Sequence, residues 1–474
     1  MTIARSDLKF VKSKTVTDTG SNGGRMSYID VLNRTKYNLF PRVTKPERIS
    51  GITRYRKEFI WNANSSDEQA FGVLAYLTLP SLANDFFNIA LGTQIDTQAD
   101  VIASSDYEWF GSGSLAADVG SSDTSISINF EDDSVDLKNN VLLAITNHFL
   151  QDQDVTSTVK VLDQVYWNGS SWVSQSAGTV ETQDIHPYGT CIELLGNNKA
   201  TIFSYTDEGF LEYHYVDSTE SNVTMSPFPD GVEVDFAATC ENLPVEPKTA
   251  KIIYTIGSTE YEVTDDGLGE FSGVHLTSGT INYGSGVINI TFNEAPMGAL
   301  VYVLYQESKV SWSGNTATVT LADGMLNDYL IADSNTFIGM CLPVGDLIPT
   351  ASATWSLQTG DFDVTKVSLT NKGTIEQSWS LLFQDATSYI CTGDEEGSLG
   401  LGYITGTFAP NNPDQGSPFI SIPVECWAGV NPTAGDLVTI HTVPSSASIW
   451  WKEEVPELTD AYSNNLTLLE LYVE

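Results

Sequence analysis

The chain has 474 residues, and its 22 lysines and arginines stand against 61 aspartates and glutamates, a formal net charge of −39. An apolar content of 41%, with 11% aromatic residues, is enough to bury substantial cores and excludes a generically disordered chain. Length alone predicts about three domains. No apolar run approaches the ~20 residues of a membrane-spanning helix, and no apolar segment follows the charged first residues, so we expect neither a membrane helix nor a secretory signal.

The basic residues are concentrated at the start of the chain. Residues 1–60 hold 13 of the 22 lysines and arginines but only 5 of the 61 acids, and no arginine follows Arg56. This asymmetry predicts a basic segment with an acidic partner. A phosphate backbone or an anionic membrane would repel the acidic remainder of the chain. We therefore expect a protein partner, including another copy of this chain, and neither nucleic acid nor membrane.

Residues 1–52 predict an extended arm that becomes ordered on its partner. The stretch TVTDTGSNGGRMSY is polar and glycine-rich, and NLFPRVTKPERISG contains two prolines, so little of this region can form a core. Only KPERISG (45–51) could form a turn of helix. Arginine suits paired hydrogen bonds to carboxylates. The candidate partner-binding residues are Arg25, Arg34, Lys36, Arg42, Lys45, Arg48, Arg54 and Arg56.

Residues 53–240 predict an N-terminal β domain, which the sequence leaves open as one large domain or two smaller ones. It begins with ITRYRKEFIWN, where alternation places Arg54 and Arg56 on one face and Tyr55, Phe59 and Trp61 on the face expected to meet the core. Alternating or β-branched runs recur along the rest of this region. They predict the strands 71–80, 86–92, 125–130 and 141–150.

The stretch YWNGSSWV (166–173) predicts a tight hairpin, because Asn168-Gly169 separates two aromatic-bearing runs. Trp167 and Trp172 would then lie opposite each other. They are candidates for stacking on a sugar. The alternative is an aromatic pair that only stabilises the hairpin.

Residues 246–309 predict a small β module, and residues 310–474 a C-terminal β-sandwich-like domain. The linker ENLPVEPK leads into two predicted hairpins, AKIIYTIG with TEYEVTDD and the two halves of GTINYGSGVINITF. Near the end of the chain Trp450 and Trp451 should point to opposite faces of a strand, one in a core and one at a surface or interface. The predicted fold class is all-β, with several β-sandwich-like modules preceded by an extended basic N-terminal arm.

No motif for catalysis, metal or cofactor stands out. The five histidines are scattered, and the five cysteines show no CxxC pair, so we expect no zinc site, no disulfide framework and no cofactor. GSLGLG (397–402) lacks the lysine and helix of a phosphate loop and predicts a β-turn. The acidic runs 131–136 and 393–397 could hold calcium or form solvated turns. Paired carboxylates of a polysaccharide hydrolase cannot be picked out by type or spacing, and we expect no enzyme.

Three stretches carry a resemblance to a known class of proteins. They are LFPRVTKPERISGITRYRKEFIWNANSSDEQAFGVLAYLTLP, SGTINYGSGVINITFNEAP and PFISIPVECWAGVNPTAGDLVTIHTVPSSASIWWKEEVP. Together they resemble virion structural proteins of tailed bacteriophages, large all-β proteins of Mu-like and other long-tailed phages. The small hairpin module is the least specific of the three. The resemblance implies a particle component that acts by assembly without catalysis, and it identifies no site residues.

The combined expectation is a structural virion protein, made in the host bacterial cytoplasm and incorporated into the particle. Its basic arm would dock onto acidic surfaces of neighbouring subunits in a symmetric neck, tail or baseplate assembly. Its partners would be other virion proteins and copies of itself in a homo-oligomer. The alternative is a receptor- or glycan-binding phage adhesin that uses Trp167 and Trp172.

Overall fold

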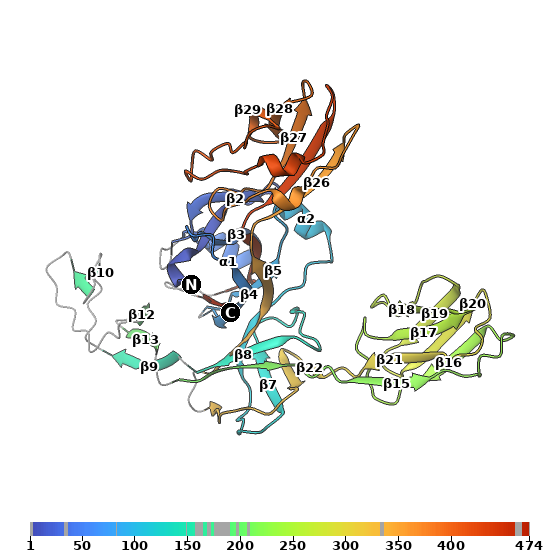
Figure 1. The fold of residues 1–474 in the computed structure, drawn as a ribbon. Coiled ribbons are helices and arrows are strands. Elements are labelled where there is room, and N and C mark those ends of the chain that lie inside the picture. The colour runs from blue at the N-terminus through green and yellow to red at the C-terminus, as the bar shows by residue number, and fades with distance from the viewer. Residues whose placement is uncertain are drawn as a thin grey trace. The chain divides into compact units, whose positions relative to one another are not determined.

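The computed structural model describes residues 3–32, 37–81, 83–147, 149–156, 165–167, 172–174, 190–195, 199–205, 209–331, 336–459 and 467–473. Strands make up 48% and helices 6%, in several antiparallel sheets, which confirms the all-β, sandwich-like class. The chain forms two compact units (Figure 1). The first comprises Met1–Tyr76, Ser81–Phe110 and Leu342–Glu474, and the second Leu77–Pro80 and Gly111–Cys341. This division differs from the predicted domains 53–240 and 310–474, because strands from both ends of the chain share one sheet.

The first unit contains a five-stranded antiparallel sheet in the order β2-β1-β3-β31-β5. Its strands are β1 (Leu8–Thr15), β2 (Gly23–Asp30), β3 (Ile52–Asn62), β5 (Phe86–Leu91) and β31 (Ser446–Val455). β3 lies between β1 and β31. It pairs with β31 along its length, from Ile52 opposite Val455 to Trp61 opposite Ser446. The sheet therefore joins residues almost 400 positions apart.

The structure differs from the predicted extended arm at residues 1–52. β1 and β2 pair with each other, and β1 also pairs with β3, from Leu8 opposite Asn62 to Lys12 opposite Glu58. The polar connection between β1 and β2 is anchored by the buried Asn22, whose Nδ2 donates to the carbonyl oxygen of Tyr55 at 2.9 Å. The described part of this segment is therefore hydrogen-bonded within the first unit and is not an extended arm.

Shorter elements complete this part of the first unit. The three-stranded sheet β25-β4-β32 is built from β4 (Ala70–Leu79), β25 (Leu342–Leu347) and β32 (Leu468–Tyr472), and the end of β4 from Leu77 onward is assigned to the second unit. The helices are η1 (Arg5–Asp7), α1 (Lys45–Ser50) and α2 (Gln98–Ala103). α1 is the predicted turn of helix. Glu47 accepts from the backbone N–H of Thr44 at 2.6 Å, as in a capping box, and Gly51 ends the helix with φ 69°.

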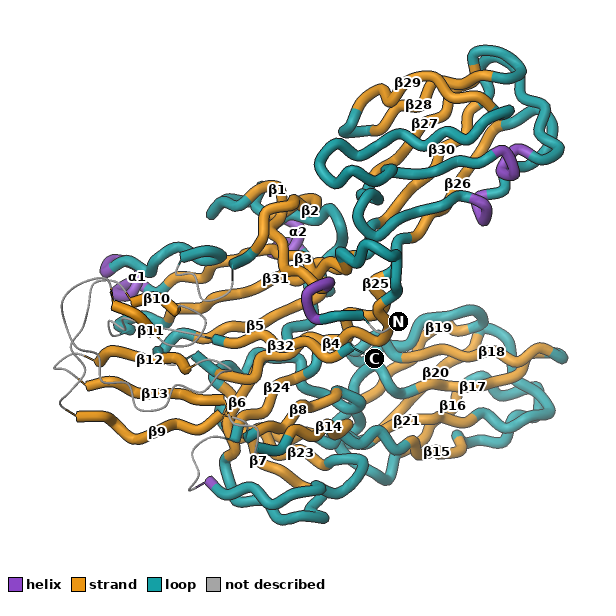
Figure 2. The backbone as a smooth tube through the Cα atoms, turned by 60° about the vertical axis from the view of Figure 1, so that its left-hand side comes forward, coloured by secondary structure: helices purple, strands orange, loops and turns teal. Residues whose placement is uncertain are grey.

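A second five-stranded sheet of the first unit has the order β26-β30-β27-β28-β29, and Figure 2 shows these strands side by side. Its elements are β26 (Thr350–Ser356), β27 (Gln377–Phe383), β28 (Ser388–Gly393), β29 (Gly397–Tyr403) and β30 (Leu437–Val443), with η3 (Val364–Lys366) and η4 (Val424–Trp427). One face packs on a cluster that includes Trp379, Tyr389, Phe419 and Trp427. The predicted β-turn in GSLGLG was wrong, because these residues form the edge strand β29.

The second unit contains a seven-stranded sheet in the order β14-β8-β24-β6-β7-β23-β22. These strands are β6 (Ser112–Leu115), β7 (Ser125–Phe130), β8 (Leu142–Thr146), β14 (Leu211–Tyr215), β22 (Val310–Ser313), β23 (Thr316–Thr320) and β24 (Phe337–Met340). Two smaller sheets belong to the same unit. They are formed by β9 (Phe149–Thr156), β12 (Thr190–Leu195) and β13 (Lys199–Tyr205), and by the hairpin of β10 (Val165–Trp167) with β11 (Trp172–Ser174).

The rest of the second unit is a small β-sandwich of two sheets around one core. The sheets, in the orders β15-β21-β17-β18 and β16-β20-β19, consist of β15 (Glu220–Thr224), β16 (Asp235–Thr239), β17 (Lys251–Ile256), β18 (Thr259–Thr264), β19 (Leu276–Asn282), β20 (Val287–Phe292) and β21 (Tyr302–Gln306). Both predicted hairpins are present. The module begins before the predicted residue 246, because β15 and β16 supply part of the core. Val245, in the predicted linker, is itself buried.

Candidate functional site

β3 places charged side chains in the interior of the first unit. Arg54, Arg56, Lys57 and Glu58 are each less than 5% exposed. The sequence predicts that Arg54 and Arg56 face a partner. In the structure both faces of this central strand are covered, and the two side chains are buried. Trp450 and Trp451 on the neighbouring β31 are likewise both buried, so placing one of them at a surface was wrong.

Arg54 joins α1 to β31 through two carboxylates. Its Nη2 lies 2.6 Å from Glu47 Oε1 and its Nη1 lies 3.3 Å from Glu453 Oε2. Burial opposes ionisation of Glu47, but hydrogen bonds from Thr44 and the pairing with Arg54 outweigh it and lower the Glu47 pKa to about 2. At Glu453 burial dominates and raises the pKa to about 7 against the attraction of Arg54.

Arg56 fixes two loops of the N-terminal region. Its Nη2 lies 2.5 Å from Asp18 Oδ1, its Nη1 donates to the carbonyl oxygen of Thr17 at 3.0 Å, and its Nε donates to that of Leu39 at 3.1 Å. The guanidinium also lies over the ring of Phe40, 5.6 Å from its centroid. Its hydrogen-bonding groups are directed to this chain, and the side chain is 4% exposed.

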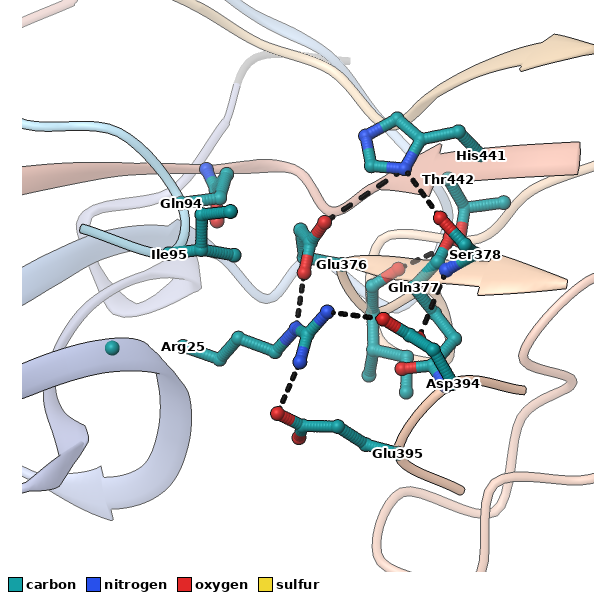
Figure 3. A network of polar contacts seen from close by, with 12 residues as sticks. Arg25, Gln94, Ile95, Glu376, Gln377, Ser378, Asp394, Glu395, His441 and Thr442 are labelled. Carbon is teal, nitrogen blue, oxygen red and sulfur yellow. Dashed lines mark hydrogen bonds and ion pairs between the residues drawn. The ribbon is translucent and has the colours of Figure 1, made fainter. Parts of the chain in front are cut away.

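Arg25 on β2 meets three carboxylates at the edge of the β26–β30 sheet (Figure 3). Its Nε pairs with Glu376, its Nη1 with Glu395, and its Nη2 with Asp394 at 2.7 Å. Glu395 also accepts from Lys14 Nζ at 2.6 Å. Burial opposes the charge of Arg25, but the carboxylates outweigh it and raise the Arg25 pKa. Two acids of the run 393–397 thus hold cations of the same chain.

The remaining predicted residues have different surroundings. Arg48 Nη1 donates to the carbonyl oxygen of Thr459 at 3.3 Å, whereas Arg42 and Lys45 have exposed side chains. Arg34 and Lys36 lie outside the described residues. Trp167 and Trp172 are opposite each other in the β10–β11 hairpin, as the sequence predicts, while its Asn168-Gly169 turn lies outside the described residues. Contact with a glycan stays a prediction.

The acidic run 131–136 contains a side-chain-stabilised turn. Asp132 accepts from the backbone N–H of Ser134 at 2.9 Å and from its hydroxyl at 2.6 Å. Among the residues that the structure describes, no group of three histidines, cysteines or acids is placed to hold a metal ion. Cys240, Cys341, Cys391 and Cys426 are free and buried.

Sequence reasoning passed over Lys57 and Glu58, which form the most deeply buried charges of β3. Lys57 Nζ lies 2.5 Å from Asp96 Oδ1. Glu58 accepts from Trp451 Nε1 at 2.6 Å, and burial raises its pKa to about 7. The run RYRKEF inside a predicted strand could have indicated these buried charges. Four charges in six residues cannot all reach solvent from a strand that is covered on both sides.

The second unit has a shallow pocket of about 350 Å³ on the sheet of β16, β20 and β19. Its lining includes Asp235, Ser278, Thr280, Asn289 and Thr291. Hydroxyl, amide and carboxylate groups of this kind can hydrogen-bond a polar ligand. Asp235 already accepts from the Thr291 hydroxyl at 2.6 Å, so part of this capacity is used within the chain.

No helix among the described residues is long and apolar enough to span a membrane. Comparison of the chain with models of protein families, with curated proteins and with solved structures found no match.

Proposed function

We propose that this chain is a non-catalytic structural protein of a tailed-bacteriophage particle. It would be made in the host cytoplasm and assembled as a homo-oligomer beside other virion proteins in a neck, tail or baseplate. The resemblance of residues 39–80 and 418–456 to such proteins supports the proposal. The division of the chain into several antiparallel β-sheets is compatible with the all-β architecture that the resemblance implies.

The residues proposed to contact a neighbouring subunit differ from those expected from the sequence. Arg25, Arg54 and Arg56 are engaged by carboxylates of their own chain, so they hold the first unit together and do not reach a neighbour. Arg42 and Lys45 are exposed and stay in the proposal as contacts to an acidic surface. The main contact is assigned to another part of the first unit.

The observation that carries the proposed contact between subunits is two neighbouring uncharged rows on one face of the β26–β30 sheet. Leu382 on β27 lies opposite Ile390 on β28, which lies opposite Leu401 on β29. These side chains are 45%, 37% and 49% exposed and form one apolar row across three strands. The next row lies two residues along β27 and β28 and, because the register shifts, three residues along β29, and it is uncharged as well. It consists of Thr354, Thr439, Ser380, Thr392 and Ser398.

This face suits a second copy of the chain. Two molecules of net charge −39 repel each other, and acids that face each other at a contact would add to this repulsion. The two rows supply a surface free of acids, and the apolar row adds a hydrophobic driving force for burial. Contiguous exposed apolar side chains on a soluble protein are typical of an interaction site.

Sedimentation velocity on the full chain tests the proposal. We expect the wild type to form a defined oligomer and the double variant Leu382→Ser/Ile390→Ser to sediment as a monomer. Leu268→Ser is the matched control, because Leu268 is 89% exposed but belongs to the second unit. A wild type that stays monomeric at every concentration, or a double variant that assembles normally, contradicts the proposed contact. Incorporation of the same variants into phage particles tests the virion role.

The second candidate function is a receptor- or glycan-binding adhesin. The register that sets Trp167 opposite Trp172 favours it, because paired aromatic residues on a hairpin can stack on a sugar ring. Binding of the full chain to a glycan array, compared with the Trp167→Ala/Trp172→Ala variant, tests this function. Equal signals from the two proteins would show that the tryptophan pair does not bind the glycan, and no binding by either protein would leave only the assembly role.

A further inference from the structure

Lys57 presents its amine to a single carboxylate inside the first unit. The side chain is 0% exposed, and its Nζ donates to the carbonyl oxygens of Gly24 at 2.8 Å and Asp96 at 3.1 Å, and to Asp96 Oδ1 at 2.5 Å. The rings of Phe59 and Trp450 lie 5.0 Å and 5.7 Å from Nζ. The amine is therefore held against the Asp96 carboxyl group, next to aromatic rings.

The two carboxylate oxygens of Asp96 have different surroundings. Oδ1 faces Lys57, whereas Oδ2 accepts from Trp450 Nε1 at 2.9 Å, from the Tyr107 hydroxyl at 2.6 Å and from the Thr93 N–H at 3.1 Å. The Asp96 side chain is 5% exposed. Three donors on one oxygen stabilise negative charge there, as an oxyanion hole does. The other oxygen lies next to the proton donor that a leaving group needs.

The site also favours removal of the two charges. Taking an ammonium and a carboxylate out of water costs several kcal/mol per ion, which their attraction only partly offsets. Burial lowers the Lys57 pKa to about 8, so a fraction of the amine is neutral and nucleophilic near neutral pH. Fixed contact between amine and carboxyl replaces a bimolecular encounter and lowers the entropic barrier to their reaction.

We propose that Lys57 and Asp96 condense into an intramolecular isopeptide bond after the first unit has folded. A proton moves from Nζ to Oδ1, which gives a neutral amine and a carboxylic acid. Nζ then attacks Cγ, and the negative charge develops on Oδ2. A second proton passes from nitrogen to the Oδ1 hydroxyl, the Cγ–Oδ1 bond breaks, and water leaves. Ammonium and carboxylate become an amide and one water, with no oxidant, reductant or co-reactant, and Oδ2 becomes the amide oxygen.

The bond would join β3 to the segment that precedes α2. This segment already contacts β2, because Gly24 N–H donates to the carbonyl oxygen of Asp96 at 2.8 Å. Gly23 has φ 107°, and a Cβ there would lie 2.9 Å from the Asp96 carbonyl oxygen, so only glycine allows this close approach. The inference does not depend on the proposed function, since it concerns one folded chain.

Intact mass spectrometry of the denatured full chain tests the inference. We expect a mass below that of the sequence by one water, about 18 Da. Trypsin should fail to cut after Lys57, and a protease that cuts after aromatic residues should release a branched peptide joining the segments around residues 57 and 96. Lys14 and Glu395 provide the internal control. They are 2.6 Å apart but 48% and 41% exposed, and we expect no link between them.

Two variants sharpen the test. Lys57→Met should show its full sequence mass. Asp96→Asn should lose ammonia, about 17 Da, and end with the same final mass as the cross-linked wild type, because both reactions give the same amide. Full sequence mass in the wild type with complete cleavage after Lys57 would overturn the inference. So would a water loss that maps to another part of the chain.

Discussion

The first sheet of the first unit and the small sandwich of the second unit differ in how many charged side chains they bury. β3 buries two arginines, a lysine and a glutamate, and β31 adds Glu453. The core cluster of the small sandwich consists of apolar and aromatic side chains such as Ile288, Phe292 and Tyr305. Its buried Asp265 accepts from the backbone N–H groups of Lys248 and Ala250 at 2.8 and 2.9 Å, and no cation among the described residues pairs with it.

Buried charges and buried apolar side chains contribute to stability in different ways. An apolar core gains stability roughly in proportion to the surface it removes from water. A buried ion pair adds little net stability, but removal of one partner leaves a charge without compensation. We therefore expect the first sheet to be specific in its contacts and sensitive to pH, and the small sandwich to respond mainly to lost volume.

The largest effect is expected for Arg54→Met. The substitution keeps much of the apolar stem but leaves Glu453, whose side chain is 4% exposed, without its cation. We expect the free energy of unfolding of the first unit to fall by about 3–5 kcal/mol. Urea unfolding followed by hydrogen exchange in β3 measures this loss. Arg42→Met, at an exposed position, should be close to neutral, and a loss of equal size there would contradict the assignment.

A somewhat smaller effect is expected for Ile288→Ala in the small sandwich. Ile288 is 0% exposed, so its truncation leaves a cavity that lowers stability by about 2–5 kcal/mol. Hydrogen exchange should accelerate in β19 and β20 but not in β3. Val287→Ala, next in sequence and 39% exposed, is the matched control. Equal losses from the two variants would argue against the apolar core as the source of stability.

The third prediction concerns pH and Glu58. Folding raises the pKa of Glu58 from 4.5 to about 7, so the native state binds more protons than the unfolded state between these values. Stability therefore falls as the pH rises from about 4.5 to 7, by on the order of 3 kcal/mol from this group. Glu58→Gln keeps an acceptor for Trp451 and should remove the contribution of this group to the pH dependence. We expect the variant to be more stable than wild type at pH 8 and similar at pH 5.

Thermal or urea unfolding at the two pH values, recorded for both units, measures this difference. The small sandwich provides the reference, because Glu58 belongs to the first unit. Glu453 acts in the same direction, since burial also raises its pKa to about 7. An unchanged pH profile in Glu58→Gln would mean that another group dominates in this range.

The same contrast explains how much the sequence could predict. The hairpins of the small sandwich were predictable because alternation and a Gly-Ser-Gly turn lie next to each other along the chain. β1 and β2 were missed, because a lysine-rich strand becomes recognisable only when its partners are known. Arg25 meets Glu376, 351 residues away. No local pattern indicates that pairing.

Charge composition predicted that arginines would meet carboxylates but not which ones. With 61 acids in the chain, each arginine can find a carboxylate in many places. The topology decides whether that carboxylate belongs to the same chain. Because β31 returns from the end of the chain to pair with β3, Glu453 lies next to Arg54. The Lys57–Asp96 contact was missed for a similar reason, since position 96 follows a strand, β5, that pairs with β31 and not with β3.

The smallest effect is expected for Lys14→Ala, which separates exposed from buried cations within one cluster. Lys14 and Arg25 both pair with Glu395, but Lys14 is 48% exposed and Arg25 is 17% exposed. Water and salt screen the exposed pair, so its loss should change the free energy of unfolding by less than about 1 kcal/mol, and less still at high ionic strength. Urea unfolding in low and high salt measures both effects, with Arg25→Ala as the more damaging counterpart. If Lys14→Ala proved as destabilising as Arg25→Ala, solvent exposure would not determine how much each ion pair contributes to the free energy of unfolding. The distinction between exposed and buried cations would then fail.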